Sequence, residues 1–384
     1  MYSLTNKTIL LISPQSWGKM FVSKHHYALE LAKKGNLVYF LNPPGEKVAG
    51  SKDNICIEVS GIHENLFLVN HHLSFPYNIK FHFIGLFHLL MQPHVKKILK
   101  KIGIRPDIVW SFDLGNLYPF SFFPKESLKV FHPVDEPLNS TAINSARGAE
   151  LMFSVTPEIL DKYKGYPIPQ HLINHGISEE FLQADPAHKN NNKIHVGFAG
   201  NLLRPDIDRR ILLQIINENP EIIFECWGSY QVSEANLSGS VDENTKQFIY
   251  GLQQSPNVKL HGTVSSPQLA KELQRMNAFL ICYDVQKDQS KGTNYHKVME
   301  YISSGKVIIA NNITGYKTEP VLVQMVEERD HNNILPALFK KIVGSLDNYN
   351  AAPLQEQRKK YATENTYGKQ IERIEQILKT AGYN

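Results

Sequence analysis

Short apolar runs alternate with helical spacing along most of this 384-residue chain. The pattern is clearest at the start, where an apolar run at 8–12 is followed by helical spacing, Gly35 and a second apolar run at 37–41. A strand, a helix and a strand in this order form a βαβ unit, whose strands pair in parallel through a right-handed crossover. The alternation recurs in both halves of the chain, so we predict an α/β fold.

A polar stretch interrupts this alternation. Residues 183–192 are polar and turn-forming, without a hydrophobic period, which is typical of a linker between domains. We therefore predict one Rossmann-like parallel-sheet domain over 1–185 and a second over 186–353. The tail at 354–384 has helical apolar spacing without a strand signal, and we expect it to pack against a domain already formed.

Composition excludes several classes of protein. The 41 basic and 37 acidic residues give a formal net charge of +4 without long runs of one sign, so nucleic acid is not an expected partner. The three cysteines are too few and too far apart for a disulfide framework or a four-cysteine zinc site. No apolar run approaches the ~20 residues of a membrane span, and the one near the start is too short for a signal peptide. We expect a cytoplasmic protein.

Open parallel sheets bind ligands beyond the carboxyl ends of their strands, so two such domains facing each other would define a cleft. The loop after the apolar run at 194–199 contains Gly200, Asn201 and Arg204. Glycine allows close approach of a ligand, a helix start offers free N–H groups, and arginine supplies a charged fork for phosphate. The same residue types also serve ordinary helix starts, so both interpretations stay open. No Rossmann G-x-G-x-x-G or P-loop motif follows a predicted strand, which disfavours dehydrogenases and nucleotide hydrolases.

The segment 292–310 is the most informative part of the chain. Asn294 is a suitable N-cap and Gly305 a suitable C-terminal residue for a helix between them. Lys297 falls in the first turn, where a cation is unfavourable with the helix dipole unless an anion lies nearby. Glu300 could accept both hydroxyls of a ribose or, alternatively, form a solvent-facing pair with Lys297.

Residues 294–306 resemble the N-x-x-K-x-x-E-Y-x-x-x-G-K helix of bacterial GT-B glycosyltransferases, especially the retaining, nucleotide-sugar-dependent enzymes of glycosyltransferase family 4 and the related group 1 transferases. The resemblance implies two facing Rossmann-like domains, the first for an acceptor and the second for a nucleotide-sugar donor, with a last helix that crosses back to the first domain. Shorter landmarks of the same family occur at 23–39, 105–110, 134–136, 174–177, 196–200 and 365–367.

The resemblance also implies roles for single residues. Glu300 would hold the nucleotide ribose, and Thr293 and Asn294 would offer backbone N–H groups to the diphosphate. Lys297 and Arg204 would neutralise the departing diphosphate, a role that requires no metal or other cofactor. The remaining predicted donor-binding residues are Gly18, Gly200, Asn201, Gly228 and Gly262.

Two positions depart from the family pattern. Gly292 stands where the family often carries a glutamate, eight residues before the ribose-binding one, and Asp288 is nearby but out of register. The acceptor loop is present, but Val134 occupies the position of its usual histidine. His132, Asp135 and Glu136 could therefore act beside the acceptor, and we take His132 and Asp135 as the candidates for a catalytic role.

Asp206 and Asp208 form a D-x-D pattern, which holds a divalent metal in a different transferase fold. The pattern lies at a predicted helix start, which favours capping and compensation of the helix dipole. We expect no metal site.

Lys96, Lys97, Lys100 and Lys101 form a basic helix face after an aromatic-rich stretch at 77–87. Such a face can dock on anionic lipid and would bring the acceptor domain to a membrane carrying a lipid-linked sugar. The alternative is the solvated face of an ordinary helix whose apolar stripe lies in the core.

Together these features predict a glycosyltransferase, in the cytoplasm or at the inner face of the cell membrane. It would move a sugar, with retention, from a nucleoside-diphosphate sugar to a surface-polysaccharide or glycolipid acceptor. Gly292 and the altered acceptor loop leave open a non-catalytic nucleotide-sugar-binding subunit of a polysaccharide assembly complex. A nucleotide-sugar epimerase has the same architecture, but we find no resemblance to its catalytic-base pattern.

Overall fold

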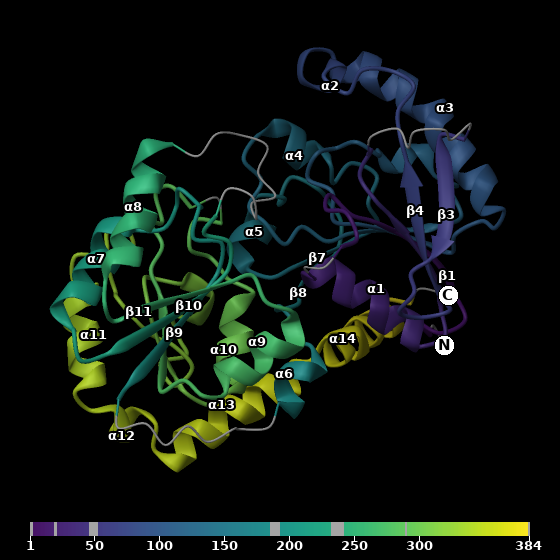
Figure 1. Ribbon diagram of the computed structural model, residues 1–384. Coiled ribbons are helices and arrows are strands. Elements are labelled where there is room, and N and C mark those ends of the chain that lie inside the picture. Colours follow the sequence, from purple (N-terminus) through teal and green to yellow (C-terminus); the bar gives the residue numbers. More distant parts are fainter. Residues whose placement is uncertain are drawn as a thin grey trace. The chain divides into compact units, whose positions relative to one another are not determined.

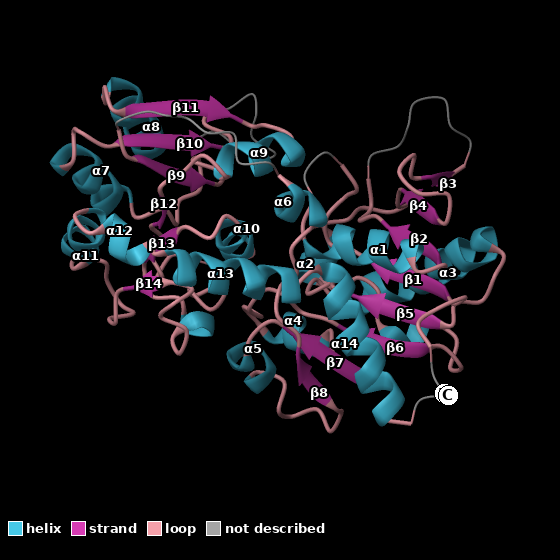
Figure 2. Ribbon diagram, turned by 90° about the horizontal axis from the view of Figure 1, so that it is seen from below, coloured by secondary structure: helices cyan, strands magenta, loops and turns pink. Residues whose placement is uncertain are grey.

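The chain folds as two α/β units (Figure 1). Unit 1 is formed by Met1–His175 with Tyr367–Asn384, and unit 2 by Gly176–Thr366. Each unit contains one sheet built mainly of parallel strands, and Figure 2 shows these strands as neighbouring arrows. The predicted fold class is therefore confirmed. The computed structural model describes residues 3–18, 21–45, 53–184, 193–231, 242–288 and 290–382.

The sheet of unit 1 contains β1 (Thr8–Ile12), β2 (Leu37–Leu41), β3 (Ile55–Val59), β4 (Leu66–His71), β5 (Ile108–Ser111), β6 (Leu128–Phe131), β7 (Leu151–Ser154) and β8 (Gln170–Leu172). Their order is β3-β4-β2-β1-β5-β6-β7-β8, and only β3 and β4 pair antiparallel. The predicted βαβ unit is confirmed, because β1 and β2 pair in parallel with Ile9 opposite Val38. β1 and β5 are completely buried, as their continuous apolar runs require.

The helices of unit 1 are α1 (Ser23–Lys33), α2 (Ile79–His82), α3 (Ile84–Ile102), η1 (Phe120–Phe122), α4 (Ser140–Asn144), α5 (Pro157–Asp161) and α14 (Tyr367–Thr380). The final helix α14 packs against α1 and buries the predicted apolar stripe of Ile371, Ile374 and Leu378. The Tyr367 hydroxyl donates to the Ser23 hydroxyl over 3.2 Å, so the last helix is also fixed to the start of α1.

The sheet of unit 2 contains β9 (His195–Ala199), β10 (Ile223–Trp227), β11 (Val258–Gly262), β12 (Ala278–Ile281), β13 (Val307–Ala310) and β14 (Gln324–Met325). All neighbours are parallel in the order β11-β10-β9-β12-β13-β14. The helices are α6 (Glu179–Gln183), α7 (Arg209–Glu218), α8 (Glu243–Gln254), α9 (Ser266–Leu273), α10 (Lys297–Ser303), η3 (Thr314–Tyr316), α11 (Leu335–Val343), α12 (Leu346–Tyr349) and α13 (Ala352–Glu364). In the described ranges, no helix combines the length and apolar character that crossing a membrane requires.

The boundaries between the units differ from those expected at 185 and 354. The first lies after His175, because α6 packs against α9 and α10 of unit 2. Most of the expected linker, 185–192, lies outside the described residues. The return to unit 1 begins only at Tyr367, because α13 packs against α10. A buried arginine holds α13 there: Arg358 donates to the carbonyl oxygens of Val321, Gly305 and Tyr349 over 2.8, 2.9 and 2.9 Å.

A buried carboxylate joins three neighbouring strands of unit 2. Glu225 on β10 accepts from His195 Nδ1 on β9 over 2.7 Å, and from Lys259 Nζ and His261 Nε2 on β11 over 3.0 and 2.6 Å. Burial raises the pKa of the Glu225 carboxyl, but hydrogen bonds from His261, Lys259 and His195 outweigh this effect and lower the pKa to about 2. The folded chain therefore stabilises the ionised form of the Glu225 carboxyl more than the unfolded chain does.

We expect Glu225→Gln to remove a pH-dependent part of the stability. A lowered carboxyl pKa stabilises the fold above the unfolded pKa near 4.5, and this gain disappears as the pH falls toward 2. The variant should be less stable than wild type by about 3 kcal/mol above pH 5, and the difference should shrink toward pH 2. Urea unfolding over a pH series measures both quantities, with the exposed Glu221→Gln as matched control. A difference that does not depend on pH would contradict the ionised cluster.

Candidate functional site

Three of the predicted glycines meet at the carboxyl edge of the unit 2 sheet. Gly200 follows β9, Gly228 follows β10 and Gly262 ends β11, on three adjacent strands. The Gly200 N–H donates to the carbonyl oxygen of Trp227, and the Gly228 N–H to that of Gly262, both over 2.8 Å. A Cβ on Gly228, which has a φ of +126°, would lie 2.0 Å from the Gly200 carbonyl oxygen. The backbone can pack this closely only without a side chain at this position.

Lys297, the first residue of α10, places its ammonium group beside these glycines. Its Nζ donates to the carbonyl oxygen of Ala199 over 2.6 Å and to the hydroxyl of Tyr283. The ammonium also lies 4.7 Å from the centre of the Tyr283 ring, in a cation–π contact. It forms no ion pair with any carboxylate of the described residues, and its third N–H has no acceptor among them. A cation held only by neutral dipoles at a strand end is well suited to bind an anion.

Tyr301, one turn further along α10, contacts the backbone of the same residue, Ala199. Its hydroxyl accepts from the Ala199 N–H over 2.7 Å, and its ring stacks on Phe279 with centroids 4.2 Å apart. Positions 297 and 301 share one face of a helix, so α10 grips the end of β9 through both side chains. Tyr301 belongs to the motif recognised in the sequence, whereas Tyr283 follows β12 without any motif and was not predicted.

Glu300 contacts His296, with its Oε1 3.0 Å from the imidazole Nε2, and its side chain is 13% exposed. The alternative pair with Lys297 is therefore not formed. The N-cap of α10 is His296 rather than the expected Asn294, and the helix is correspondingly shorter. The Thr293 N–H, which was expected to offer itself to a diphosphate, donates to the Ser290 carbonyl oxygen over 3.0 Å. The hydrogen bond between Thr293 and Ser290 would have to break before the Thr293 N–H could bind a diphosphate.

Asp288 organises the loop that leads to α10. Its buried carboxylate accepts from the N–H groups of Ser290 and Gly292 over 3.1 and 3.0 Å, and from the Tyr295 hydroxyl over 2.7 Å. Burial raises the pKa of Asp288, but hydrogen bonds from Ser290, Tyr295 and Gly292 outweigh it, so the pKa is lowered. Gly292 has a φ of +66°, and a Cβ there would lie 2.9 Å from the Asn312 carbonyl oxygen. This backbone therefore has no room for the glutamate that the family often carries.

Arg204 has carboxylate partners in the structure. Its Nε lies 2.9 and 3.1 Å from the two carboxylate oxygens of Asp206, and one of its terminal nitrogens lies 3.7 Å from Asp288. The hydrogen bond with Asp206 raises the pKa of the guanidinium. The side chain is 46% exposed, so Arg204 is a permanent cation within reach of a ligand, although its charge is shared. Asn201 shapes the turn before it, because its Oδ1 accepts from the Leu203 N–H over 2.9 Å.

Both D-x-D carboxylates form hydrogen bonds with other groups of the protein. Asp206 holds Arg204, while Asp208 caps α7 by accepting from the Ile211 N–H over 3.2 Å and also accepts from Asn332 over 2.9 Å. The expected capping role is confirmed for Asp208.

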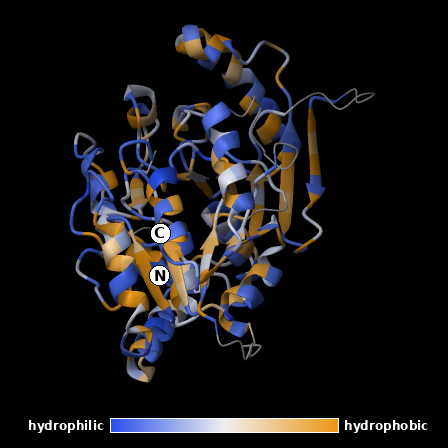
Figure 3. Ribbon diagram, turned by 60° about the vertical axis from the view of Figure 1, so that its left-hand side comes forward, coloured by the Kyte–Doolittle hydropathy of each residue, from blue (hydrophilic) through white to orange (hydrophobic). Residues whose placement is uncertain are grey.

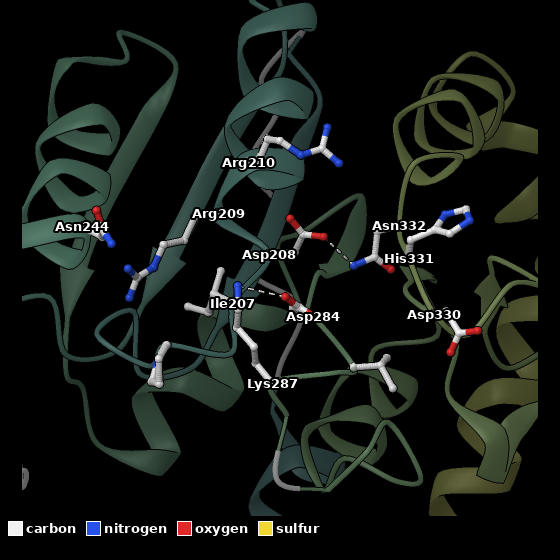
Figure 4. A pocket seen from close by; sticks show the side chains of 12 residues that line it. Ile207, Asp208, Arg209, Arg210, Asn244, Asp284, Lys287, Asp330, His331 and Asn332 are labelled. Atoms are coloured by element: carbon white, nitrogen blue, oxygen red, sulfur yellow. Dashed lines mark hydrogen bonds and ion pairs between the residues drawn. The ribbon is translucent and has the colours of Figure 1, made fainter. Parts of the chain in front are cut away.

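A cavity of about 510 Å³ lies next to this capping residue (Figure 4). Acidic and basic side chains alternate around it, and Lys287 is paired with Asp284 over 3.0 Å. None of the residues that line the cavity belongs to the predicted donor site. The candidate site is therefore the group of strand ends near Lys297, whose ammonium has no carboxylate partner among the described residues, and not this cavity.

The predicted residues of unit 1 occupy different environments. His132 is completely buried, with its ring 4.8 Å from that of Phe112, and burial lowers its pKa to about 3. A neutral side chain without solvent contact does not reach an acceptor, which argues against the catalytic role expected for His132. Asp135 is exposed beyond β6 and attracts the buried ammonium of Lys24, whose pKa is lowered by burial and partly restored by Asp135. Among the described residues, none but the chain neighbours of Gly18 lies within 4 Å of where its Cβ would be.

No protein-family model matches the chain, and no curated protein matches it. Solved structures match along nearly its whole length. Sucrose-phosphate synthase from Thermosynechococcus elongatus is 12% identical with a TM-score of 0.71, and the match covers 98% of this chain and 100% of that one. Anabaena HepE in complex with UDP and glucose is 13% identical with a TM-score of 0.67, covering 98% and 100%. The lipopolysaccharide outer core galactosyltransferase WaaB is 14% identical with a TM-score of 0.58, covering 95% and 98%.

These likenesses show that the chain has the GT-B glycosyltransferase fold, with two parallel-sheet units. The resemblance to GT-B enzymes stated from residues 294–306 is thereby confirmed at the level of the fold. Membership of family 4 stays a prediction.

We expect Gly228→Ala to separate the loops after β9 and β10, because the added methyl group would overlap the Gly200 carbonyl. The strain should lower the free energy of unfolding by about 3 kcal/mol. Gly251→Ala in α8 is the matched control, since its Cβ would meet only Leu213 at 3.5 Å. The control should be neutral or stabilising by about 0.5–1 kcal/mol, because glycine weakens a helix interior. Chemical denaturation of both variants measures this, and equal stability of Gly228→Ala and wild type would contradict the close packing.

Proposed function

We propose that this chain is a glycosyltransferase that transfers a sugar from a nucleoside-diphosphate sugar to a saccharide or lipid-linked acceptor. The observation that carries the proposal is the ammonium group of Lys297, held by neutral dipoles beside Gly200 at the carboxyl end of β9. It lies in a GT-B fold whose solved relatives include a protein in complex with UDP and glucose. Open α/β sheets bind nucleotides at this edge.

In this proposal the residues near β9 stabilise the leaving group. Breaking the sugar–phosphate bond moves negative charge onto the diphosphate, and a fixed cation lowers the energy of that charge as it develops. Lys297 supplies this cation with its remaining N–H donor, and Arg204 supplies a second one from the adjoining loop. The absence of a side chain at Gly200 lets the Lys297 ammonium lie against the backbone there, 2.6 Å from where a Cβ would be.

Glu300 is the proposed partner of the nucleotide ribose. Its carboxylate is mostly buried on α10, one turn after Lys297, and contacts His296. A carboxylate in this position can accept hydrogen bonds from two neighbouring hydroxyls. The contact with His296 uses the Oε1 atom, so the carboxylate can still accept hydrogen bonds from a ribose.

We propose that transfer requires no metal ion. The two D-x-D carboxylates are already used, Asp206 by Arg204 and Asp208 by the start of α7. Cationic side chains then provide the charge compensation that a divalent ion supplies elsewhere.

We further propose retention of the anomeric configuration and a surface-polysaccharide or glycolipid acceptor. Retention rests on the likeness of residues 294–306 to retaining transferases, and the acceptor class is supported by the likeness to a lipopolysaccharide galactosyltransferase. Asp135, exposed beyond β6 in unit 1, is the proposed acceptor-side residue. The unpaired thiols of Cys56, Cys226 and Cys282 support a cytoplasmic location.

A second candidate is a non-catalytic nucleotide-sugar-binding subunit. It is favoured by Gly292, whose positive φ and contact with the Asn312 carbonyl leave no room for a glutamate that would hold the sugar. Both candidates share the nucleotide site, so binding alone does not separate them, whereas turnover does.

We expect Lys297→Ala to weaken binding of UDP by roughly 10–100-fold, because a charged hydrogen bond to the diphosphate is lost. Glu300→Gln should weaken binding of UDP through the ribose, by about tenfold. The exposed Lys341→Ala on α11 is the control of equal charge change and should bind as wild type does. Titration calorimetry measures all three. If wild type binds UDP and both site variants bind it equally well, the site is wrong.

We expect the purified chain to hydrolyse or transfer sugar from a nucleoside-diphosphate sugar, with undiminished rate in excess EDTA. Incubation with UDP-glucose and with other nucleotide sugars, followed by NMR of the released or transferred sugar, measures the rate and the anomer of the product. Product of the donor's own anomeric configuration supports retention. Nucleotide binding without any turnover would favour the non-catalytic subunit.

A further inference from the structure

Large apolar side chains gather on an exposed part of unit 1. Phe81, Phe83 and Leu89 are 69, 67 and 67% exposed, and Tyr77 and Leu86 are exposed beside them. All five lie on α2, the first half of α3 and the residues around them, which project beyond the strands of the unit 1 sheet (Figures 1 and 3). We call these five residues the apolar ridge. Exposed aromatic residues gathered in this way mark an interaction surface.

The exposed side of α3 changes character along the helix. Leu86, Leu89, Pro93, Lys96 and Lys100 follow one another at intervals of three and four residues, and all are exposed. This line is apolar in its first half and basic in its second. The opposite side of the helix faces the core, as the expected apolar stripe requires, through Phe87, Met91, His94, Val95, Ile98 and Ile102. An ordinary solvated helix face accounts for the lysines but not for the exposed leucines and phenylalanines.

The segment that carries the ridge has charges of one sign only. Residues 65–106 contain no aspartate or glutamate. Lys101 is paired with Asp53 over 3.0 Å, whereas Lys96, Lys97 and Lys100 form no ion pair within the described part of the chain. The ridge with its basic end therefore matches a surface that is apolar inside and anionic outside, which is the make-up of an anionic lipid bilayer.

The spacing of the two parts fits the depth of a membrane interface. Leu89 and Lys96 are separated by about 10 Å along α3, at 1.5 Å per residue. Apolar groups of interfacial helices lie ~5–10 Å below the headgroup boundary. When the turn between α2 and α3 enters the bilayer first, the ridge reaches the acyl chains while the lysines remain among the headgroups.

The ridge adjoins the carboxyl edge of the unit 1 sheet. His88 Nε2 on α3 donates to the Asn116 carbonyl oxygen over 2.7 Å. A Cβ on Gly115 would lie 2.9 Å from Lys80 Nζ, so the ammonium of α2 lies against the same loop. Residues 112–118 follow β5, where an open parallel sheet binds its ligand.

We propose that the apolar ridge and Lys96, Lys97 and Lys100 dock unit 1 on an anionic lipid bilayer. The docked bilayer lies beside the loop after β5, and membrane binding itself does not depend on nucleotide-sugar chemistry. The acceptor then belongs to the lipid-linked class, a statement that rests on the proposed function.

Sedimentation of the full chain with phosphatidylcholine vesicles, with and without phosphatidylglycerol, tests the docking. Binding should require phosphatidylglycerol and decrease as salt rises. The double change Phe81→Ser with Phe83→Ser should weaken binding at least tenfold, as expected for losing two buried phenyl groups. Lys96→Gln and Lys100→Gln should each weaken it about fivefold at low salt. Tyr250→Ser, an equally exposed aromatic position on α8 of unit 2, should leave it unchanged.

A second measurement reports insertion directly. Phe83→Trp should show a blue-shifted emission on addition of phosphatidylglycerol vesicles, relative to wild type. No binding at low salt, or an unshifted emission, would overturn the proposal. A self-association in the absence of lipid that is lost in the Phe81→Ser, Phe83→Ser variant would assign the ridge to a second copy instead. UDP binding by that variant should equal that of wild type, so failure of the docking and failure of the proposed nucleotide site are separately visible.

Discussion

The donor-side geometry depends on how the end of β9 is held. The backbone N–H of Ala199 donates to the Tyr301 hydroxyl, and the Ala199 carbonyl oxygen accepts from the ammonium of Lys297. Because both side chains come from one face of α10, this helix is fixed against the strand end by two adjacent contacts. The position of Gly200 follows directly, and Gly228 packs against the Gly200 carbonyl with no space for a side chain. One strand terminus thus sets the helix, the cation and the glycine-lined edge together.

Sequence patterns predicted the parts of this arrangement that are local. Apolar runs at 8–12, 37–41 and 194–199 located β1, β2 and β9, and the spacing from Lys297 to Tyr301 placed those side chains on one helix. Asp288 and Tyr283 were not recognised, because their importance comes from partners that converge on them in a folded loop. The sequence pattern also did not predict that α13 packs against unit 2. Its attachment to unit 2 rests on Arg358, a polar residue whose hydrogen bonds to three carbonyls leave no hydrophobic signature.

His132 and Asp135 in unit 1 also show what a sequence pattern can and cannot predict. Two residues separate them, and the sequence offered both as acceptor-side candidates. In the structure the first lies inside an aromatic cluster with a lowered pKa, while the second is exposed beyond β6. The chain leaves the sheet between these two positions, so one side chain belongs to the core and the other to the edge. Burial, which no short motif encodes, decides which of them is accessible from outside the protein.

The two cations of the proposed donor site differ in what surrounds them. Arg204 lies between Asp206 and Asp288, so a diphosphate bound as proposed would compete with carboxylates for it. The ammonium of Lys297 is stabilised by a carbonyl, a hydroxyl and an aromatic face, which hold the charge without neutralising it. Neutral dipoles leave the field of a cation available to an anion, whereas a paired carboxylate cancels much of it. In the proposed reaction, charge that develops on a leaving diphosphate would therefore be stabilised chiefly by Lys297, and Arg204 would orient the group from the loop.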